Sequence, residues 1–310
     1  MIRTAHKFTG MGVALVTPFT PDRGIDYESL RSLLEHVLMD GAADFVVVHG
    51  TTGESPCLTR DERNEVTRVV VEQVAGRCPI LVGLGGNDTL ELGKRFAEAP
   101  TEGIDGFLSV VPYYNKPTQE GLFQHFCHIS ERSRLPIILY NVPGRVGVNM
   151  MPETIIRLAK SCHNIVGVKE ASGYVMQAEQ VVQAGLGDGF VVLSGDDALS
   201  VSFMQNGARG VISVVGNAYP RLFSHLIHLA MQGEYNEADM IMTALRETNA
   251  QLFANGNPSG IKALLYQMGV IRHNILRLPL VPTSREVYDA LGAAHQRVKD
   301  FALASFLPWP

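Results

Sequence analysis

A single lysine stands at the end of a short apolar run, where its charge would be hard to solvate. Residues 165–168 have the continuous small and apolar character of a strand buried on both faces, and Lys169 follows them directly. Burial disfavours a charged ammonium and lowers the pKa of a lysine from its usual value of about 10.4. A neutral amine can attack a ketone carbon and form a Schiff base. Lys169 is therefore either a buried nucleophile or an ordinary strand-end lysine whose side chain turns out to solvent.

Other polar residues also stand directly after short apolar runs. Tyr140 ends one run and Arg145 follows it closely, while Gly195 follows another run. The remaining members of this set are two pairs, Thr51 with Thr52 and Tyr113 with Tyr114. Each has an ordinary structural explanation, since tyrosines suit the rim of a sheet and threonines form turns and caps. The carboxyl ends of parallel strands meet at one rim, however, so we expect these residues and Lys169 to form one site.

The elements that would position this site alternate along the chain. Eight apolar runs recur about every 20 to 35 residues, the size of a βα unit, and helical patterns fill the intervals. Thr59–Glu62, for example, fits the capping box that starts a helix. Eight such units favour a (β/α)8 TIM barrel over an open doubly wound sheet. The runs are residues 12–17, 45–48, 80–83, 105–111, 136–140, 165–169, 191–194 and 210–214.

The chain changes character after the eighth run. From residue 221 onward the pattern is helical only, and no ninth strand is indicated. We therefore predict a catalytic barrel over residues 1–220 and a C-terminal helical extension, packed on it, over residues 221–310. The apolar tail, residues 301–310, would dock either on this body or on a neighbouring subunit.

Composition excludes several classes of protein. The chain has 310 residues, 46% of them hydrophobic and 18% charged, with a net charge of −5, which indicates a well-filled core. The sequence has no basic run of the kind that binds nucleic acid, and it has no signal peptide or membrane-spanning run. The four cysteines are widely spaced, which is typical of reduced thiols in a cytoplasmic protein and gives no sign of zinc. We expect no metal and no cofactor.

Six motifs at the strand ends together carry a family resemblance. In unbroken order over residues 10–269, they resemble the dihydrodipicolinate synthase and N-acetylneuraminate lyase family of pyruvate-dependent aldolases. Arg145 and the motif at residues 112–117 are similar to the dihydrodipicolinate synthase branch, because the lyases lack that arginine. The motifs are residues 50–54, 112–117, 140–145, 167–172, 194–197 and 210–214.

The resemblance implies a reaction and the residues that catalyse it. Lys169 would form an imine with pyruvate, and the derived enamine would attack aspartate 4-semialdehyde to give 4-hydroxy-tetrahydrodipicolinate, on the route to diaminopimelate and lysine. Tyr140, Thr52 and Tyr114 would form a hydroxyl relay for protons, since a hydroxyl both donates and accepts. Tyr114 would reach in from a neighbouring subunit of a homotetramer, a dimer of dimers.

The same resemblance implies how the substrates are held. Thr51 and Thr52 would bind the carboxylate of pyruvate, and Arg145 would bind that of the semialdehyde through its planar fork of donors. Gly195 and Ile212 would line the pocket, largely through backbone carbonyls. The segment 257–260 lacks a second proline that is common in the family, which we interpret as a loop variation away from the chemistry.

A regulatory site for lysine is also implied, in altered form. The matching positions that are retained are Ser55, Asn87, Glu91 and Tyr113. The departures are Pro56, Arg60 and Arg63, where sensitive members often carry a smaller residue and two histidines. Arginine keeps its charge whereas histidine is mostly neutral near pH 7.5, so the arginines would repel the ammonium groups of lysine. We therefore expect weak inhibition or none.

Three other functions remain open. One is an aldolase of the same family that acts on a sugar acid or another aldehyde, against which Arg145 argues. Another is a metal-dependent enzyme that uses Asp44, Asp196 and Asp197, although adjacent aspartates after a strand usually cap a helix. The third is a binding barrel without turnover. Residues 83–87 are too short a match for a dinucleotide-binding loop.

Overall fold

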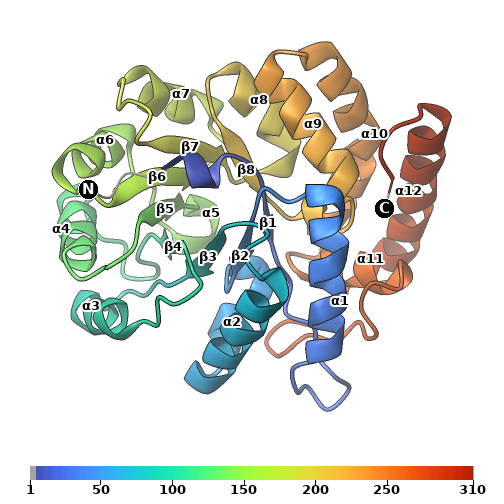
Figure 1. The fold of residues 1–310 in the computed structure, drawn as a ribbon, viewed down its shortest axis with the longest axis horizontal. Helices are drawn as coiled ribbons and strands as arrows, with labels where there is room; N and C mark the ends of the chain where they lie inside the picture. Colours follow the sequence, from blue (N-terminus) through green and yellow to red (C-terminus); the bar gives the residue numbers. More distant parts are fainter. Residues whose placement is uncertain (1–4, 310) are drawn as a thin grey trace.

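The computed structural model describes residues 5–309 and shows a closed barrel of eight parallel strands (Figure 1). Each strand pairs with the next one in the sequence, and β8 closes the ring by pairing with β1, where Ile212 lies opposite Gly12. The predicted (β/α)8 fold is therefore confirmed. The strands are β1 (Gly10–Ala14), β2 (Phe45–Val48), β3 (Ile80–Gly83), β4 (Gly106–Val110), β5 (Ile137–Asn141), β6 (Ile165–Glu170), β7 (Val191–Ser194) and β8 (Gly210–Ser213).

Helices surround the barrel, and five of them start after a residue whose side chain accepts a hydrogen bond from a free backbone amide: α1, α2, α3, α4 and α12. Asp26 caps α1, accepting a hydrogen bond from the Ser29 amide at 3.0 Å, and the predicted capping box of Thr59 and Glu62 opens α2. The helices are α1 (Tyr27–Leu38), α2 (Arg60–Val74), α3 (Thr89–Glu98), α4 (Gln119–Ser130), α5 (Pro143–Val146), α6 (Pro152–Ser161), α7 (Val175–Gln183), α8 (Ser200–Gln205), α9 (Pro220–Gln232), α10 (Tyr235–Ala254), α11 (Ser259–Gln267) and α12 (Arg285–Ala304).

The first strand begins two residues earlier than its predicted run and ends three residues earlier. Its start contains Gly10 and Gly12, residues that weaken a strand signal in sequence. A Cβ on Gly12 would come within 2.2 Å of the Phe45 ring, so the neighbouring strand requires a glycine there. Packing against β2 thus determines where this strand lies, and a local sequence pattern does not reveal that packing.

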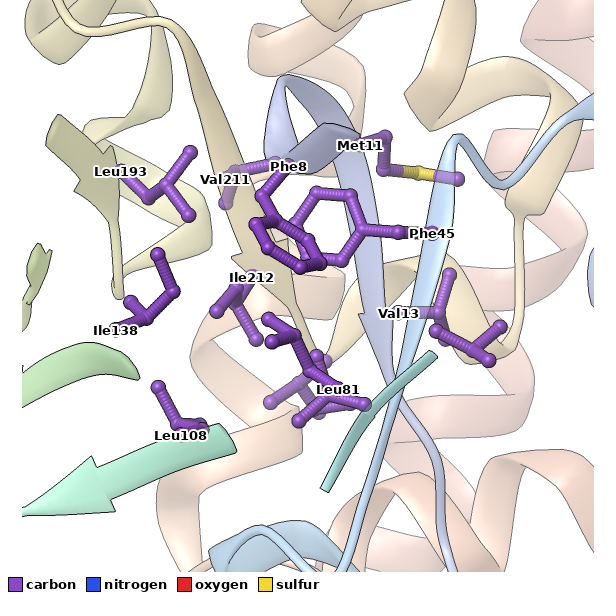
Figure 2. Close-up of a cluster of buried hydrophobic side chains, with 14 of the residues drawn as sticks. Phe8, Met11, Val13, Phe45, Leu81, Leu108, Ile138, Leu193, Val211 and Ile212 are labelled. Carbon is purple, nitrogen blue, oxygen red and sulfur yellow. The ribbon is translucent and has the colours of Figure 1, made fainter. Parts of the chain in front are cut away.

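Apolar side chains fill the amino-terminal half of the barrel. Figure 2 shows Phe8 beside Phe45 and near Leu81 and Ile212, and the two phenyl rings meet edge to face with centroids 5.9 Å apart. Phe8 belongs to the short helical turn Ala5–Phe8 that precedes β1. The interior is filled with apolar side chains at this end, so polar chemistry has room only at the carboxyl ends of the strands.

The C-terminal helices pack against one side of the barrel. In Figure 1, α10 lies beside α9 and α12 lies beside α10, and α9 in turn packs on β1 and α1. The predicted division at residue 220 coincides with the start of α9, which contacts the barrel strands as the other outer helices do. That division stays a prediction.

The apolar tail docks on its own chain. The Trp309 ring lies 5.6 Å from the ring of Tyr219 and 5.7 Å from that of His295, measured between centroids. The Arg221 guanidinium donates a hydrogen bond to the Trp309 carbonyl at 2.9 Å. These contacts tie the tail to α9 and α12. None of the helices within residues 5–309 has the length and apolar character that crossing a bilayer requires.

Candidate active site

A cavity of about 150 Å³ opens at the carboxyl ends of the strands. It brings together residues from seven of the eight strands or from the segments that follow them, as expected for the functional face of such a barrel. The predicted site residues that line it are Thr51, Thr52, Tyr140, Arg145, Lys169 and Gly195.

Lys169 projects into the barrel and not out to solvent. Only 7% of its surface is exposed, and its Nζ lies 4.4 Å from the centroid of the Tyr140 ring. The two residues face each other across the β5–β6 pairing. One pleat repeat below, Gly167 contributes no side chain, and a Cβ there would collide with Ile138 Cδ1 at 2.8 Å. The strand geometry therefore aims the amine at the cavity, beside a phenol.

Gly195 fits the lysine closely because it has no side chain. A Cβ at this position would lie 3.1 Å from Lys169 Cε and 2.5 Å from Ala171 Cβ. The backbone at the end of β7 thus forms one wall of the slot that holds the lysine stem.

The turn Thr51–Gly53 carries the two threonines and is flanked by two residues with left-handed backbone conformations. His49, just before the turn, has φ 60°, and Glu54, just after it, has φ 53°. Left-handed conformations at residues other than glycine cost on the order of 1–3 kcal/mol and persist only where surrounding contacts hold them. Thr52 is 3% exposed within this turn. The turn must therefore be fixed by contacts from elsewhere in the chain.

A buried ion pair supplies one of these contacts. The Nζ of Lys262, on α11, lies 2.5 Å from Glu54 Oε1, and both side chains are fully buried. The same Nζ donates to the Ile275 carbonyl at 2.9 Å, and the Arg277 amide donates to Glu54 Oε2 at 3.0 Å. Burial lowers the pKa of Lys262 to about 8, against the opposing attraction of Glu54. Sequence reasoning missed this pair, although a lysine within the apolar run 261–265 was a usable signal.

Asn257 supplies another contact, and it corrects a prediction. Its Nδ2 donates a hydrogen bond to Thr52 Oγ1 at 2.9 Å, and both residues line the cavity. The interpretation of segment 257–260 as a variation away from the chemistry is therefore wrong. The loop between α10 and α11 reaches the cavity, because the extension packs against the face where the Thr51–Gly53 turn lies.

Arg145 stands at the mouth of the cavity on the one-turn helix α5. Pro143 begins this helix, where a proline costs no hydrogen bond, and Gly147 ends it with φ 82°. Arg145 is exposed, and none of residues 5–309 provides its guanidinium with a carboxylate partner. An unpaired guanidinium at a cavity mouth is well suited to bind a carboxylate of a ligand.

Two predicted residues lie apart from this cavity. The Ile212 side chain is buried in the apolar interior (Figure 2), and Val214, two residues later, lines the cavity instead. Tyr114 is 88% exposed with φ 73°, and it does not reach the cavity of its own chain. The roles assigned to both residues stay predictions.

The residues of the predicted lysine site lie in the segments that follow β2, β3 and β4. Asn87 Nδ2 donates to the Tyr113 carbonyl at 3.2 Å, which joins the ends of β3 and β4. Arg63 Nη1 donates to the carbonyls of Ser55 at 3.3 Å and Leu58 at 2.9 Å. Burial lowers the pKa of Arg63, and the like charges of two nearby arginines lower it further. The fourth position, Glu91, lies in the first turn of α3, and the two arginines near Arg63 are Arg60 and Arg95.

The three aspartates of the metal hypothesis cannot share one ion. Asp44 precedes β2, at the amino-terminal end of the barrel, and its Oδ2 accepts from the Met11 amide at 2.7 Å. Asp197 follows β7, at the opposite end, where its Oδ2 accepts from the Val214 amide at 2.8 Å. Asp196 caps the helical turn that begins at Asp197. Within the described part of the chain, no group of three histidine, cysteine or acidic side chains is placed to hold a metal ion.

Comparisons with known proteins agree with this geometry. A model of the dihydrodipicolinate synthetase family matches residues 7–298. The 4-hydroxy-tetrahydrodipicolinate synthase of Porphyromonas gingivalis is 54% identical over 293 residues, which cover 94% of this chain and 98% of that protein.

Solved structures show the same similarity. A crystal structure of dihydrodipicolinate synthase from Thermotoga maritima has a TM-score of 0.91 at 40% identity and covers 95% of this chain and 99% of its own. The chloride-inhibited dihydrodipicolinate synthase from Acinetobacter baumannii, in complex with pyruvate, has a TM-score of 0.89 at 38% identity, with 94% and 99% covered. Because these matches span both the barrel and its extension, the chain belongs to the dihydrodipicolinate synthetase family.

Proposed function

We propose that this protein condenses pyruvate with aspartate 4-semialdehyde to give 4-hydroxy-tetrahydrodipicolinate, the activity that its relative from Porphyromonas gingivalis is named for. The observation that carries the proposal is the buried Lys169, held against the Tyr140 ring in a cavity with two threonines and an arginine. A lysine that is buried without a carboxylate partner is suited to act as a nucleophile and not as a structural cation.

The reaction proceeds through an imine on Lys169. The amine attacks the keto carbon of pyruvate, and loss of water gives the imine, which withdraws electrons from the methyl group. Loss of a methyl proton gives an enamine, whose carbon attacks the aldehyde carbon of the second substrate. The amino group of that substrate then attacks the imine carbon, closing the ring and releasing Lys169. Each step moves a proton, which is the task of the relay through Tyr140, Thr52 and Tyr114.

The two carboxylates of the substrates have separate partners in this proposal. The Thr51–Gly53 turn offers hydroxyls and backbone amides beside Lys169, which suit the carboxylate of pyruvate. The exposed guanidinium of Arg145 suits the carboxylate of the semialdehyde as it enters. A pyruvate complex of the Acinetobacter baumannii relative supports the first substrate.

A second copy of the chain completes the relay. Tyr114 protrudes from the loop after β4 and is absent from the lining of its own cavity, which supports a role in the site of a neighbour. Assembly as a dimer of dimers, and a location in the cytoplasm, stay predictions.

Trapping with borohydride tests the proposal. The protein is incubated with pyruvate, reduced, digested and mapped by mass spectrometry, with Lys169→Arg as the control because arginine is not neutral at physiological pH. We expect a reduced pyruvate adduct on Lys169 and none in the variant. An unmodified Lys169, or turnover by the variant near the wild-type rate, would contradict the Schiff-base mechanism. Turnover with aspartate 4-semialdehyde, compared with sugar-acid aldol substrates, then separates the proposed activity from that of a related aldolase.

A further inference from the structure

We propose that Asn257 is a positioning residue for this reaction, because it sets the direction in which the Thr52 hydroxyl passes its proton. The inference rests on the proposed function, since the direction of that hydroxyl matters only if Thr52 relays protons.

Asn257 and Thr52 form a buried, hydrogen-bonded pair beside the cavity. Asn257 is 7% exposed and Thr52 is 3% exposed, and both line the cavity with Tyr140 and Lys169. The hydrogen bond from Asn257 Nδ2 to Thr52 Oγ1, 2.9 Å long, is the one bond that the described residues make to this hydroxyl. The second polar atom of the amide, Oδ1, is buried and has no hydrogen-bond partner within residues 5–309. The hydrogen bond to Thr52 is therefore the one hydrogen bond that the Asn257 side chain makes within residues 5–309.

The chemistry of an amide N–H then constrains the hydroxyl. A threonine hydroxyl has one proton and two acceptor lone pairs, whereas an amide N–H only donates. With one lone pair occupied by Asn257, the proton of Thr52 is directed elsewhere, toward the cavity that Tyr140 also lines. In each transfer, Thr52 Oγ1 accepts a proton on its remaining lone pair as its own proton leaves, so the hydroxyl ends uncharged. An acceptor in place of Asn257 would instead draw the proton of Thr52 away from the relay.

The extension holds this donor firmly against the turn. Asn257 lies in the loop between α10 and α11, and the two helices approach closely at Gly260, where a Cβ would come within 2.4 Å of the Leu252 carbonyl oxygen. Farther along α11, Lys262 binds Glu54 at the other end of the same turn. The donor and its acceptor are thus fixed to each other at two points.

The experiment compares two substitutions at one position. Asn257→Asp keeps the shape of the side chain, but its carboxylate accepts a hydrogen bond and does not donate one. We expect its kcat to fall at least tenfold at neutral pH. As the pH falls, the acid becomes protonated and can donate to Thr52, so kcat relative to wild type should rise again; burial raises the pKa of such a carboxyl into an accessible range. Asn257→Leu has neither group and should lose kcat by a similar factor at every pH.

A matched control comes from the same loop. Asn255 is exposed, and its Oδ1 accepts from Thr283 Oγ1 at 2.7 Å and from the Ser284 amide at 2.9 Å. Asn255→Asp keeps both acceptor roles, so its kcat and its pH profile should match those of the wild type. Borohydride trapping after long incubation with pyruvate should still label Lys169 in all variants.

Two results would overturn the inference. One is a wild-type kcat for Asn257→Asp at neutral pH. The other is a loss that is equal for the aspartate and leucine variants at every pH, which would mean that Asn257 acts through packing alone. If the aspartate variant does not fold, a folded Asn257→Leu variant with the kcat of the wild type would also overturn the inference. Absence of pyruvate trapping on Lys169 in the wild type would instead refute the proposed function.

Discussion

The slot that holds Lys169 is closed on one side by the backbone of Gly195. We predict that Gly195→Ala lowers both the yield of the trapped imine and kcat by at least tenfold, since displacing a reacting group by about 1 Å can cost a hundredfold in rate. The added methyl group would stand 3.1 Å from Lys169 Cε and only 2.5 Å from Ala171 Cβ. Gly144→Ala is the control, because a Cβ there meets no atom within 4 Å. Full trapping by the Gly195 variant would show that the lysine stem has more freedom than the structure gives it.

Arg145 offers a second test at the residue scale. We predict that Arg145→Ala lowers kcat/KM for aspartate 4-semialdehyde about a hundredfold, because a charge-assisted contact contributes about 2–3 kcal/mol. Trapping of the pyruvate imine should be unchanged, since Arg145 lies at the mouth of the cavity. Arg297→Ala, which removes an exposed ion pair with Glu247 in the extension, provides the control. An unchanged kcat/KM for the semialdehyde would show that Arg145 does not bind this substrate.

Sequence reasoning found the residues whose positions are unusual and missed those whose partners are remote. Lys169 was visible because a lysine is out of place at the end of a buried strand. The partners of Asn257 and Lys262 were not visible, because they lie 205 and 208 positions away and no local pattern links them. Ile212 shows a third limit. Its side chain lies among the apolar residues inside the barrel and not at the cavity, and the sequence does not reveal how far along a strand the cavity reaches.

At the scale of elements, Asp26 connects α1 to the chain after α11. Burial opposes ionisation of Asp26, but hydrogen bonds from Arg272 and Ser29 outweigh it and hold the pKa of the carboxyl at about 2. We predict that Asp26→Asn, which retains a good helix cap, lowers the stability by about 1–2 kcal/mol at pH 7.

The pH dependence of that loss separates charge from capping. The ionised carboxyl stabilises the fold above its unfolded pKa of about 4, and this contribution disappears as the pH falls toward 2. The difference in unfolding temperature between wild type and variant should therefore shrink over this range. Asp239→Asn, on the exposed face of α10, should show no difference at any pH. A difference that stays constant down to pH 2 would assign the effect to the cap alone.

The order and type of the elements could be predicted, and the limits of β2, β3 and β7 match their predicted runs, whereas the limits of the other strands differ by one to three residues. All eight strand runs and the cap of α2 correspond to the structure. The first run was displaced toward its C-terminus because Gly10 hides the true start of β1, where contacts with the neighbouring strand and the residue before it take precedence over local propensity.

At the scale of the whole molecule, Tyr114 tests whether two chains build one site. We predict that co-assembled Tyr114→Phe and Lys169→Ala chains regain activity that neither has alone. In a mixed dimer, one cavity would combine an intact lysine with an intact tyrosine from the other chain. The measurement uses two affinity tags to purify mixed oligomers. Mixed oligomers as inactive as their parents would place the action of Tyr114 within its own chain.

Sensitivity to lysine also belongs to this scale. We predict that the initial rate changes little up to about 1 mM lysine, because Arg63 is fixed on the Ser55 and Leu58 carbonyls and keeps its positive charge there. The assay is a lysine titration at pH 7.5, with Arg63→His as the comparison. Inhibition of the wild type at sub-millimolar lysine would show that this charge binds the carboxylate of lysine and does not repel its ammonium groups.

The ion pair between Glu54 and Lys262 has a consequence for protein synthesis. A ribosome delivers Glu54 early and Lys262 only after all eight strands, 208 residues later. Until then the carboxylate of Glu54 has no cation beside it and stays hydrated, because burying it alone would cost several kcal/mol. We therefore expect the turn that carries Thr52 to reach its final conformation only after Lys262 has been synthesised. We expect the emerging barrel to contain Lys169 already, and to acquire a complete pocket only when translation is nearly finished.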